Sequence, residues 1–94
     1  MAIGQEKGPD IELVVHGDEF YARYETPDGF PVVYDDERGL FCYAHVRRGR
    51  YVSSGVPATE APPSGVRRHA KEAAAVRQEK AGAREAARRP PDGA

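Results

Sequence analysis

The sequence predicts an α+β fold, in which a small antiparallel β-meander with a candidate short helix precedes a Pro-rich linker and a long exposed C-terminal helix. Two observations lead to this prediction. Ile, Leu, Val, Phe and Tyr are concentrated between Ile11 and Val56, and turn residues divide that region into short runs. After Gly65 the chain offers mainly Ala, Arg and Glu, which favour a solvated helix.

These patterns divide the 94 residues into five parts. We expect a flexible lead-in at 1–10, a β-rich module at 11–56, a Pro-rich linker at 57–64, a charged Ala/Arg-rich helix at 65–89 and a tail at 90–94. The apolar fraction is only 39%, so the core is thin. A domain this small buries about 60% of the surface of its unfolded chain, and a partner surface is the expected support.

The first strand is expected at 11–15, where alternation places Ile11, Leu13 and Val15 on one face. A turn follows at 26–29, because its Pro presets an early turn dihedral and its Gly accepts a left-handed one. The remaining strand-like runs are 30–34, 40–46 and 51–54, joined by turns at 35–39 and 47–50. The first two runs are expected to form a hairpin, and the third returns as another strand of the meander. Pro31 is expected at the start of a strand.

Residues 18–26 fit two structures. As a helix, the segment starts with Asp18 as N-cap and has Phe20, Tyr21 and Tyr24 on one side. As a strand, it directs Phe20, Ala22 and Tyr24 inward. The helix is slightly favoured.

The C-terminal helix is expected to begin after a Ser64 cap and to end at Arg89, before two prolines. It lacks an apolar stripe, because Val66, Ala70 and Ala73 are followed by Arg77 on the same face. A helix stabilised mainly by Ala propensity and isolated ion pairs frays when alone, so it connects the β-module to something else or lies on it.

Charge is distributed asymmetrically along the chain. Residues 1–65 carry eleven acidic and six basic side chains, whereas residues 66–89 carry eight basic and three acidic ones. The two halves therefore attract each other, or two different partners. The sequence argues against nucleic acid as a partner, because the basic residues are interleaved with Glu and no aromatic side chain follows Tyr51.

No catalytic set is found in the sequence. There is no His-Glu-x-x-His pair, no Gly-rich phosphate loop and no nucleophile elbow, and His16 and His45 have no partner fixed by spacing. The acidic loop at 35–37 lacks calcium-loop spacing and is expected to be a solvated turn. Cys42 shares a strand face with Leu40 and Ala44, which favours a small core residue.

No apolar run resembles a signal-peptide core, and none has the length needed to span a bilayer. The sequence therefore predicts no membrane partner. It leaves the compartment undetermined.

Four runs, in order, are similar to a known family: Gly17-Asp-Glu-Phe-Tyr-Ala-Arg-Tyr-Glu-Thr26, Asp28-Gly29-Phe30-Pro-Val-Val, Gly39-Leu-Phe-Cys-Tyr-Ala44 and Ser54-Gly55-Val56. Over residues 11–80 the chain resembles the N-terminal pro-region of the immune inhibitor A type of zinc metallopeptidases, peptidase family M six. The Pro-rich stretch and Gly65-Val-Arg-Arg-His69 resemble the family's connector to the protease. The family's zinc-binding helix has no counterpart here.

The resemblance implies a non-catalytic, pro-domain-like module that packs on a metallopeptidase domain, in cis or in trans, or assists its folding. It implies zinc only in that absent domain, no cofactor in this chain, and export of a parent protein. Cys42 is a candidate thiolate that caps the partner's zinc. The expected core or interface residues are aromatic: Phe20, Tyr24, Phe30, Phe41 and Tyr43.

Two alternatives remain open. The chain is the front part of an active metallopeptidase, which a His-Glu-x-x-His beyond Ala94 in the reading frame would support. Alternatively, it is a free-standing interaction module whose basic helix docks on an acidic protein or a nucleic acid, and salt-sensitive binding would distinguish the nucleic-acid version.

Overall fold

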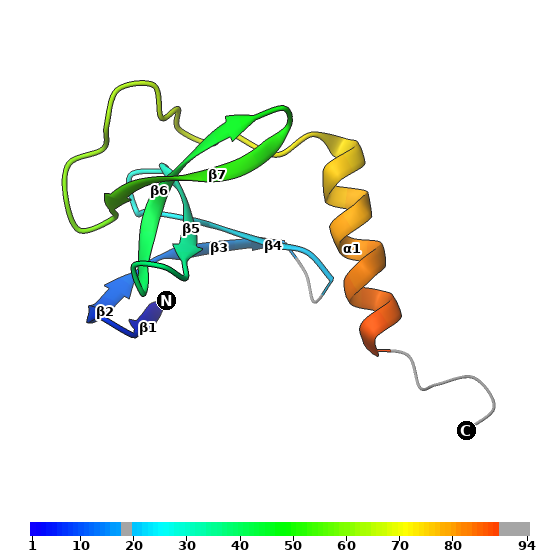
Figure 1. Ribbon diagram of the computed structural model, residues 1–94, viewed down its shortest axis with the longest axis horizontal. Coiled ribbons are helices and arrows are strands. Elements are labelled where there is room, and N and C mark those ends of the chain that lie inside the picture. Colours follow the sequence, from blue (N-terminus) through cyan, green and yellow to red (C-terminus); the bar gives the residue numbers. More distant parts are fainter. Residues whose placement is uncertain (18–19, 89–94) are drawn as a thin grey trace.

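The computed structural model describes residues 1–17 and 20–88 and has an α+β fold (Figure 1). Its described part contains a two-stranded sheet, a five-stranded sheet and one α-helix. The elements are β1 (Ala2–Gln5), β2 (Gly8–Glu12), β3 (Val14–Gly17), β4 (Ala22–Glu25), β5 (Pro31–Asp35), β6 (Leu40–Arg47), β7 (Arg50–Pro57) and α1 (Ala74–Arg88). The predicted antiparallel sheet and C-terminal helix are confirmed at this level.

The five-stranded sheet is a meander in which each strand pairs with the next in sequence, from β3 to β7. All four pairings are antiparallel. The predicted hairpin is present, with Val33 opposite Cys42, and Pro31 begins β5, where its missing N–H costs no ladder bond. Between β6 and β7 the register shifts near Gly55, whose φ of 79° permits an extra residue to be accommodated.

The expectation of a flexible lead-in at 1–10 is wrong. Residues 1–12 form the β1–β2 hairpin, in which Ile3 lies opposite Ile11. Ile3 packs on the core, and the side-chain oxygen of Gln5 accepts a hydrogen bond from the backbone of Phe41 at 2.7 Å. These contacts reach across the sequence and supply the order that local composition does not.

The favoured short helix at 18–26 is also wrong, and the alternative strand is correct for residues 22–25. β4 pairs with β3 on one side and with β5 on the other, so its backbone is hydrogen-bonded without a helix. The predicted cap, Asp18, lies outside the described residues. Phe20 lies in a bend before the strand.

The helix begins at Ala74 rather than near Gly65, because tertiary contacts hold residues 65–73 in another conformation. Val66 is buried in the core, at 8% exposure. His69 has a φ of 58°, which a helix does not permit, and its N–H donates to the carbonyl of Gly29 at 2.8 Å. The expected helix end at Arg89 and the tail at 90–94 lie outside the described residues.

The core cluster combines residues of the strands and their connections with Val66, which lies in the segment that runs from β7 to α1 (Figure 1). Leu13 is fully buried and Val32 nearly so. Aromatic rings extend this cluster through tilted and edge-on contacts, with centroids 5.8 Å apart for Tyr24 and Phe41 and 6.0 Å apart for Phe30 and Tyr43. Val15 is 40% exposed, so the predicted face of three residues holds only for Ile11 and Leu13.

Leu13→Ala tests this core. Leu13 has no exposed surface and joins the two sheets, so its truncation leaves a cavity and should lower the free energy of unfolding by about 2–5 kcal/mol. Urea unfolding followed by circular dichroism measures the change. The neighbouring Val14→Ala is the matched control, because Val14 is 42% exposed and should change stability by about 0.5 kcal/mol or less. Equal losses in both variants would contradict this core.

Candidate functional site

A buried carboxylate, Glu25, joins the end of β4 to two other parts of the chain. Its residue exposure is 2%, although it carries a charge. Arg23 donates to one carboxylate oxygen, and His16 Nε2 lies 2.9 Å from the other. His69 Nδ1 lies 3.1 and 3.2 Å from the two oxygens. One acidic side chain therefore ties β3, β4 and the segment before α1 together.

The pKa of Glu25 shows that these partners outweigh burial. Burial raises the pKa of a carboxyl group, but the hydrogen bonds from Arg23, His16 and His69 lower the pKa of Glu25 below its usual value. The ionised form is therefore the stable one in the folded chain.

The turn before β5 is shaped to receive His69. A Cβ atom at Gly29 would lie 2.7 Å from the His69 ring, and the φ of 92° at this glycine is one that other residues adopt at a cost. Beside it, the Arg68 guanidinium lies 4.9 Å from the centre of the Phe30 ring. The Asp-Gly-aromatic turn and the Arg-Arg-His segment thus meet in one contact.

A second buried carboxylate, Glu72, holds α1 beside the sheet. Glu72 is 3% exposed and accepts hydrogen bonds from the Tyr21 hydroxyl and the Tyr51 N–H, each at 2.9 Å. Lys80, from the second turn of α1, donates to both of its oxygens at 2.8 and 2.6 Å. Burial raises the pKa of Glu72, but Lys80, the Tyr51 N–H and Tyr21 reverse this and hold it below its usual value.

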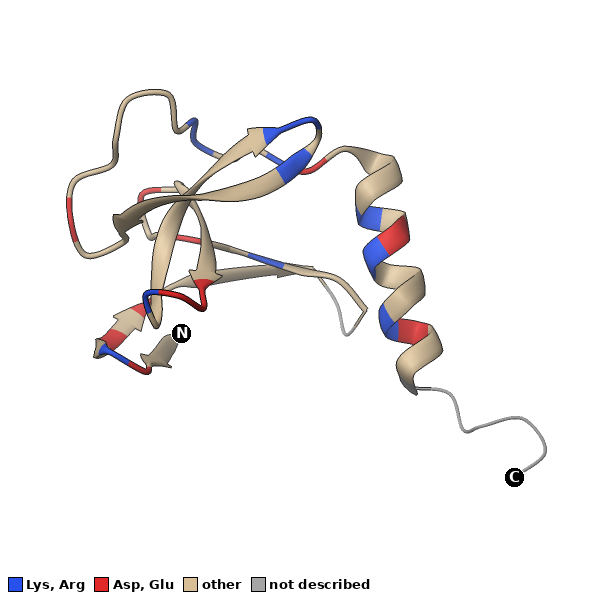
Figure 2. Ribbon diagram, in the orientation of Figure 1, with Lys and Arg blue, Asp and Glu red and all other residues tan. Residues whose placement is uncertain are grey.

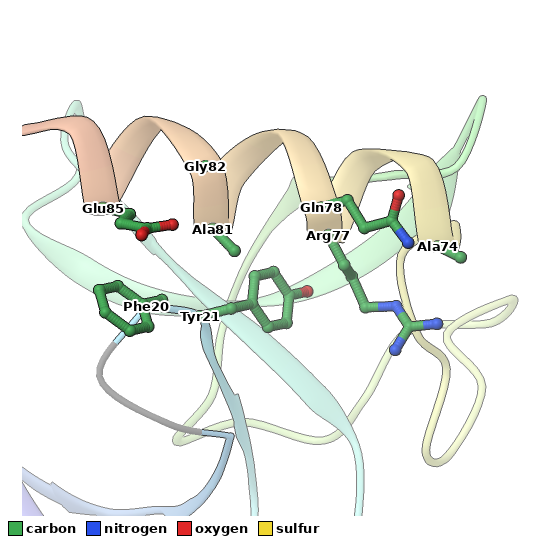
Figure 3. Close-up of a pocket in the computed structure, with 8 residues that line it drawn as sticks. All are labelled: Phe20, Tyr21, Ala74, Arg77, Gln78, Ala81, Gly82 and Glu85. Atoms are coloured by element: carbon green, nitrogen blue, oxygen red, sulfur yellow. The ribbon is translucent and has the colours of Figure 1, made fainter.

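These polar contacts leave space between α1 and the sheet. The helix-side hollow, of about 480 Å³, lies between the β3–β4 connection and one face of α1: Phe20, Tyr21, Ala74, Arg77, Gln78, Ala81, Gly82 and Glu85. Figure 3 shows Phe20, Tyr21 and Arg77 on the same side of the helix, with the Tyr21 hydroxyl directed toward Arg77. Three of the six helix residues on this face are small, namely Ala74, Ala81 and Gly82, and they do not fill the gap.

The sheet-side hollow, of about 450 Å³, continues from the same two aromatic residues onto the sheet. Its walls combine aromatic rings with basic side chains: Phe20, Tyr21, Tyr24, Tyr34, Phe41, Tyr51, Arg23, Lys80 and Arg84, together with Ala22, Val33 and Glu72. Because Phe20 and Tyr21 line both hollows, we treat the two as one cleft, called the helix–sheet cleft.

Basic and acidic residues are interspersed along α1 (Figure 2). The helix carries four basic and two acidic residues. Lys80 pairs with Glu72, and Glu79 pairs with Arg50 at 2.7 Å. Lys80 belongs to the basic helix that the sequence suggested for docking on a partner, and its charge is therefore neutralised by an ion pair within the chain.

Cys42 lies in the core, as its strand face predicted. It has no exposed surface, and burial raises the pKa of its thiol. For Cys42 to cap a zinc ion of a partner, its strand would have to open and the thiol would have to ionise against that preference.

The five predicted interface aromatics divide into two groups. Phe41 and Tyr43 are buried, and the Tyr43 hydroxyl donates to the carbonyl of Glu60 at 2.6 Å, so they serve the core. Phe20, Tyr24 and Phe30 are half-buried. Of these, Phe20 and Tyr24 line the helix–sheet cleft.

Sequence reasoning missed Glu25, Glu72 and His69 as organising residues, and found no partner for His16. The spacing of Arg23 and Glu25 was a usable sign, because in a strand residues two apart lie on one face. Glu72 offered no such sign. His45 is half-buried beside Gly65, and in the acidic loop Asp35 accepts from Ser53 Oγ at 2.8 Å and pairs with Arg38.

Within residues 1–17 and 20–88, no three His, Cys, Asp or Glu side chains are placed to hold a metal ion together. The described part of the chain also has no helix with the length and apolar character to cross a membrane. No family model matches the chain, and no curated protein or solved structure is significantly similar to it.

Glu25→Gln should lower the free energy of unfolding at pH 7 by about 3–5 kcal/mol, because it leaves Arg23 beside an uncharged partner in a buried site. The pKa of Glu25 is depressed, so its contribution is present above the ordinary value of 4.5 and is lost as pH falls through the folded value. The variant should therefore lose less stability between neutral and acidic pH than the parent chain does. Urea unfolding at several pH values measures both effects.

Glu12→Gln is the control for this pair, because Glu12 is 64% exposed at its side chain and should contribute little. An unchanged pH dependence in Glu25→Gln would contradict the role of this carboxylate.

Glu72→Ala should release α1 from the sheet without unfolding the meander. It removes hydrogen bonds to Tyr21, Tyr51 and Lys80, and each charged hydrogen bond is worth about 1.5–3 kcal/mol. Amide hydrogen exchange should quicken in Ala74–Arg88 by about tenfold or more, while β5 and β6 keep their protection. In the control Glu79→Ala, whose side chain is 63% exposed, helix exchange should change little.

Proposed function

We propose that this chain is a non-catalytic, pro-region-like module of a zinc metallopeptidase, which packs on a peptidase domain outside this chain or assists its folding. The observation that carries this proposal is the helix–sheet cleft. It gives a small domain a concave, aromatic and basic surface suited to a protein partner. Aromatic and Arg side chains are the residues that most often anchor protein interfaces.

The placement of the resembling motifs supports the proposal. The Gly17-to-Thr26 run contributes Tyr21 to the Glu72 contact and ends in the Glu25 cluster. The Asp28-Gly29-Phe30 turn and the connector-like Arg68-His69 contact one another through Gly29 and Phe30. Residues that carry the resemblance therefore also make contacts that hold the fold together around the cleft.

We assign the Pro-rich segment 57–64 and α1 to the connector that leads toward the peptidase domain. Pro62-Pro63 disfavours regular structure in this stretch, and α1 presents exposed residues such as Ala75 and Ala83. The proposal places zinc in the peptidase domain and gives Cys42 a structural role in the core.

Binding to a peptidase domain of the resembling family tests the proposal. The purified chain should bind such a domain with a dissociation constant in the micromolar range or tighter, as expected for an interface of about 1,200–2,000 Å². It should also change the refolding yield or the activity of that domain. Isothermal titration calorimetry and refolding assays measure these effects.

The variant Phe20→Ala should weaken this binding by about tenfold or more, because an aromatic anchor at a cleft contributes over about 1 kcal/mol. Val52→Ala, on an exposed position of β7 at 46%, is the control and should bind as the parent chain does. Neither binding nor any effect on folding or activity would overturn the proposed function.

A further inference from the structure

We infer that the helix–sheet cleft recognises a carboxylate group attached to an apolar or aromatic group on the partner protein, with Arg77 as the residue that binds the carboxylate. This inference rests on the proposed function and names the chemistry of the partner segment that enters the cleft.

The first observation is a buried donor without an acceptor. Arg77 Nε has no hydrogen-bond partner within the described part of the chain, although it is shielded from solvent. A buried N–H of a charged group that makes no hydrogen bond destabilises the folded state. Arg77 also lines the helix-side hollow beside Phe20 and Tyr21 (Figure 3), so an anionic group in this hollow lies beside a guanidinium whose Nε has no acceptor within the described part of the chain.

The second observation is the balance of charge around the cleft. Arg23 is paired with Glu25, and Lys80 with Glu72. Within residues 1–17 and 20–88, Arg77 and Arg84 line the cleft without making an ion pair. The cleft therefore has basic side chains available for an anionic group.

The third observation limits the charge of that group. Glu72 and Glu85 also line the cleft, and they oppose a strongly negative ligand such as a phosphate or a nucleic-acid strand. A single carboxylate matches one guanidinium in charge and in its planar, two-pronged geometry. The aromatic walls next to Arg77 accept the apolar part of the same ligand.

The volume of the helix-side hollow, about 480 Å³, falls within the range in which proteins enclose small ligands or single side-chain groups. The occupant we assign is therefore one acidic or C-terminal residue of the peptidase domain together with a neighbouring apolar side chain. A second copy of this chain and a nucleic acid become outcomes of the test.

Phenylacetate is a suitable probe, because it joins one carboxylate to one aromatic ring, and phenylacetamide is its uncharged counterpart. In nuclear magnetic resonance titrations of the full chain, phenylacetate should shift the signals of Phe20, Tyr21 and the Arg77 side chain, with a dissociation constant of roughly millimolar order. Phenylacetamide should bind about tenfold more weakly or not at all. Arg77→Gln should lose the preference for phenylacetate, and Arg77→Lys should keep part of it.

Arg48→Gln is the control, because it removes the same charge from an exposed turn residue that lines neither hollow. Circular dichroism establishes that each variant is folded, and the Lys variant keeps the test valid if the Gln variant is not. Equal binding of the two probes, or shifts that do not involve the cleft, would overturn the inference.

The peptidase-binding experiment separates this inference from the proposed function. If Arg77→Gln binds a peptidase domain as tightly as the parent chain, the inference fails and the proposed function stands. If phenylacetate binds through Arg77 but no peptidase domain binds, the proposed function fails and the carboxylate site stands. Sedimentation of the chain alone detects self-association, which would make a second copy of the chain the occupant of the cleft. Salt-sensitive binding of a single-stranded oligonucleotide through Arg77 would overturn the inference, because the recognised anion would then be a phosphate and not a protein carboxylate.

Discussion

The position of the segment that leads into α1 depends on one buried negative charge, that of Glu25. A carboxylate removed from water requires partners in good geometry, and here they come from β3, β4 and the segment after the proline-rich stretch. His69 is the distant partner, and it fixes residues 65–73 against the turn at Gly29. Glu72 follows three residues later and α1 begins two residues after that, so the place of the helix follows from the place of His69.

The parts of the fold that local chemistry determines could be predicted from the sequence. Turn residues and β-branched runs indicated the hairpin of β5 and β6 and its return as β7, since their pairing partners are neighbours in the chain. The β1–β2 hairpin and the non-helical conformation of 65–73 could not be predicted in this way. Gln5 binds the backbone of Phe41, and His69 binds that of Gly29, and neither contact leaves a periodic pattern in the sequence.

The same limit applies to the site. Arg23 and Glu25 would have lain together on a strand face, but a helical interpretation of 18–26 separates them, so the choice of period concealed the buried cluster. Glu72 resembles any other acidic residue in a charged helix until its partners Tyr21, Tyr51 and Lys80 are brought to it by the fold. Phe20 and Tyr24 were among the five aromatic residues expected in the core or an interface, because the core is thin and the chain resembles a pro-region, but the sequence could not separate the two roles.

The cleft is a consequence of how α1 is attached. A helix with an apolar stripe would pack directly on the sheet and exclude a ligand, whereas the inward face here offers Ala74, Ala81, Gly82 and the partly unsatisfied Arg77. Polar contacts at Glu72 fix the helix at a distance from the sheet without closing the space. A partner that fills this space stabilises the docked helix by mass action, since it binds only the form in which helix and sheet stand together. The thin core and the open cleft therefore have one cause, which is that α1 brings little apolar surface to the sheet.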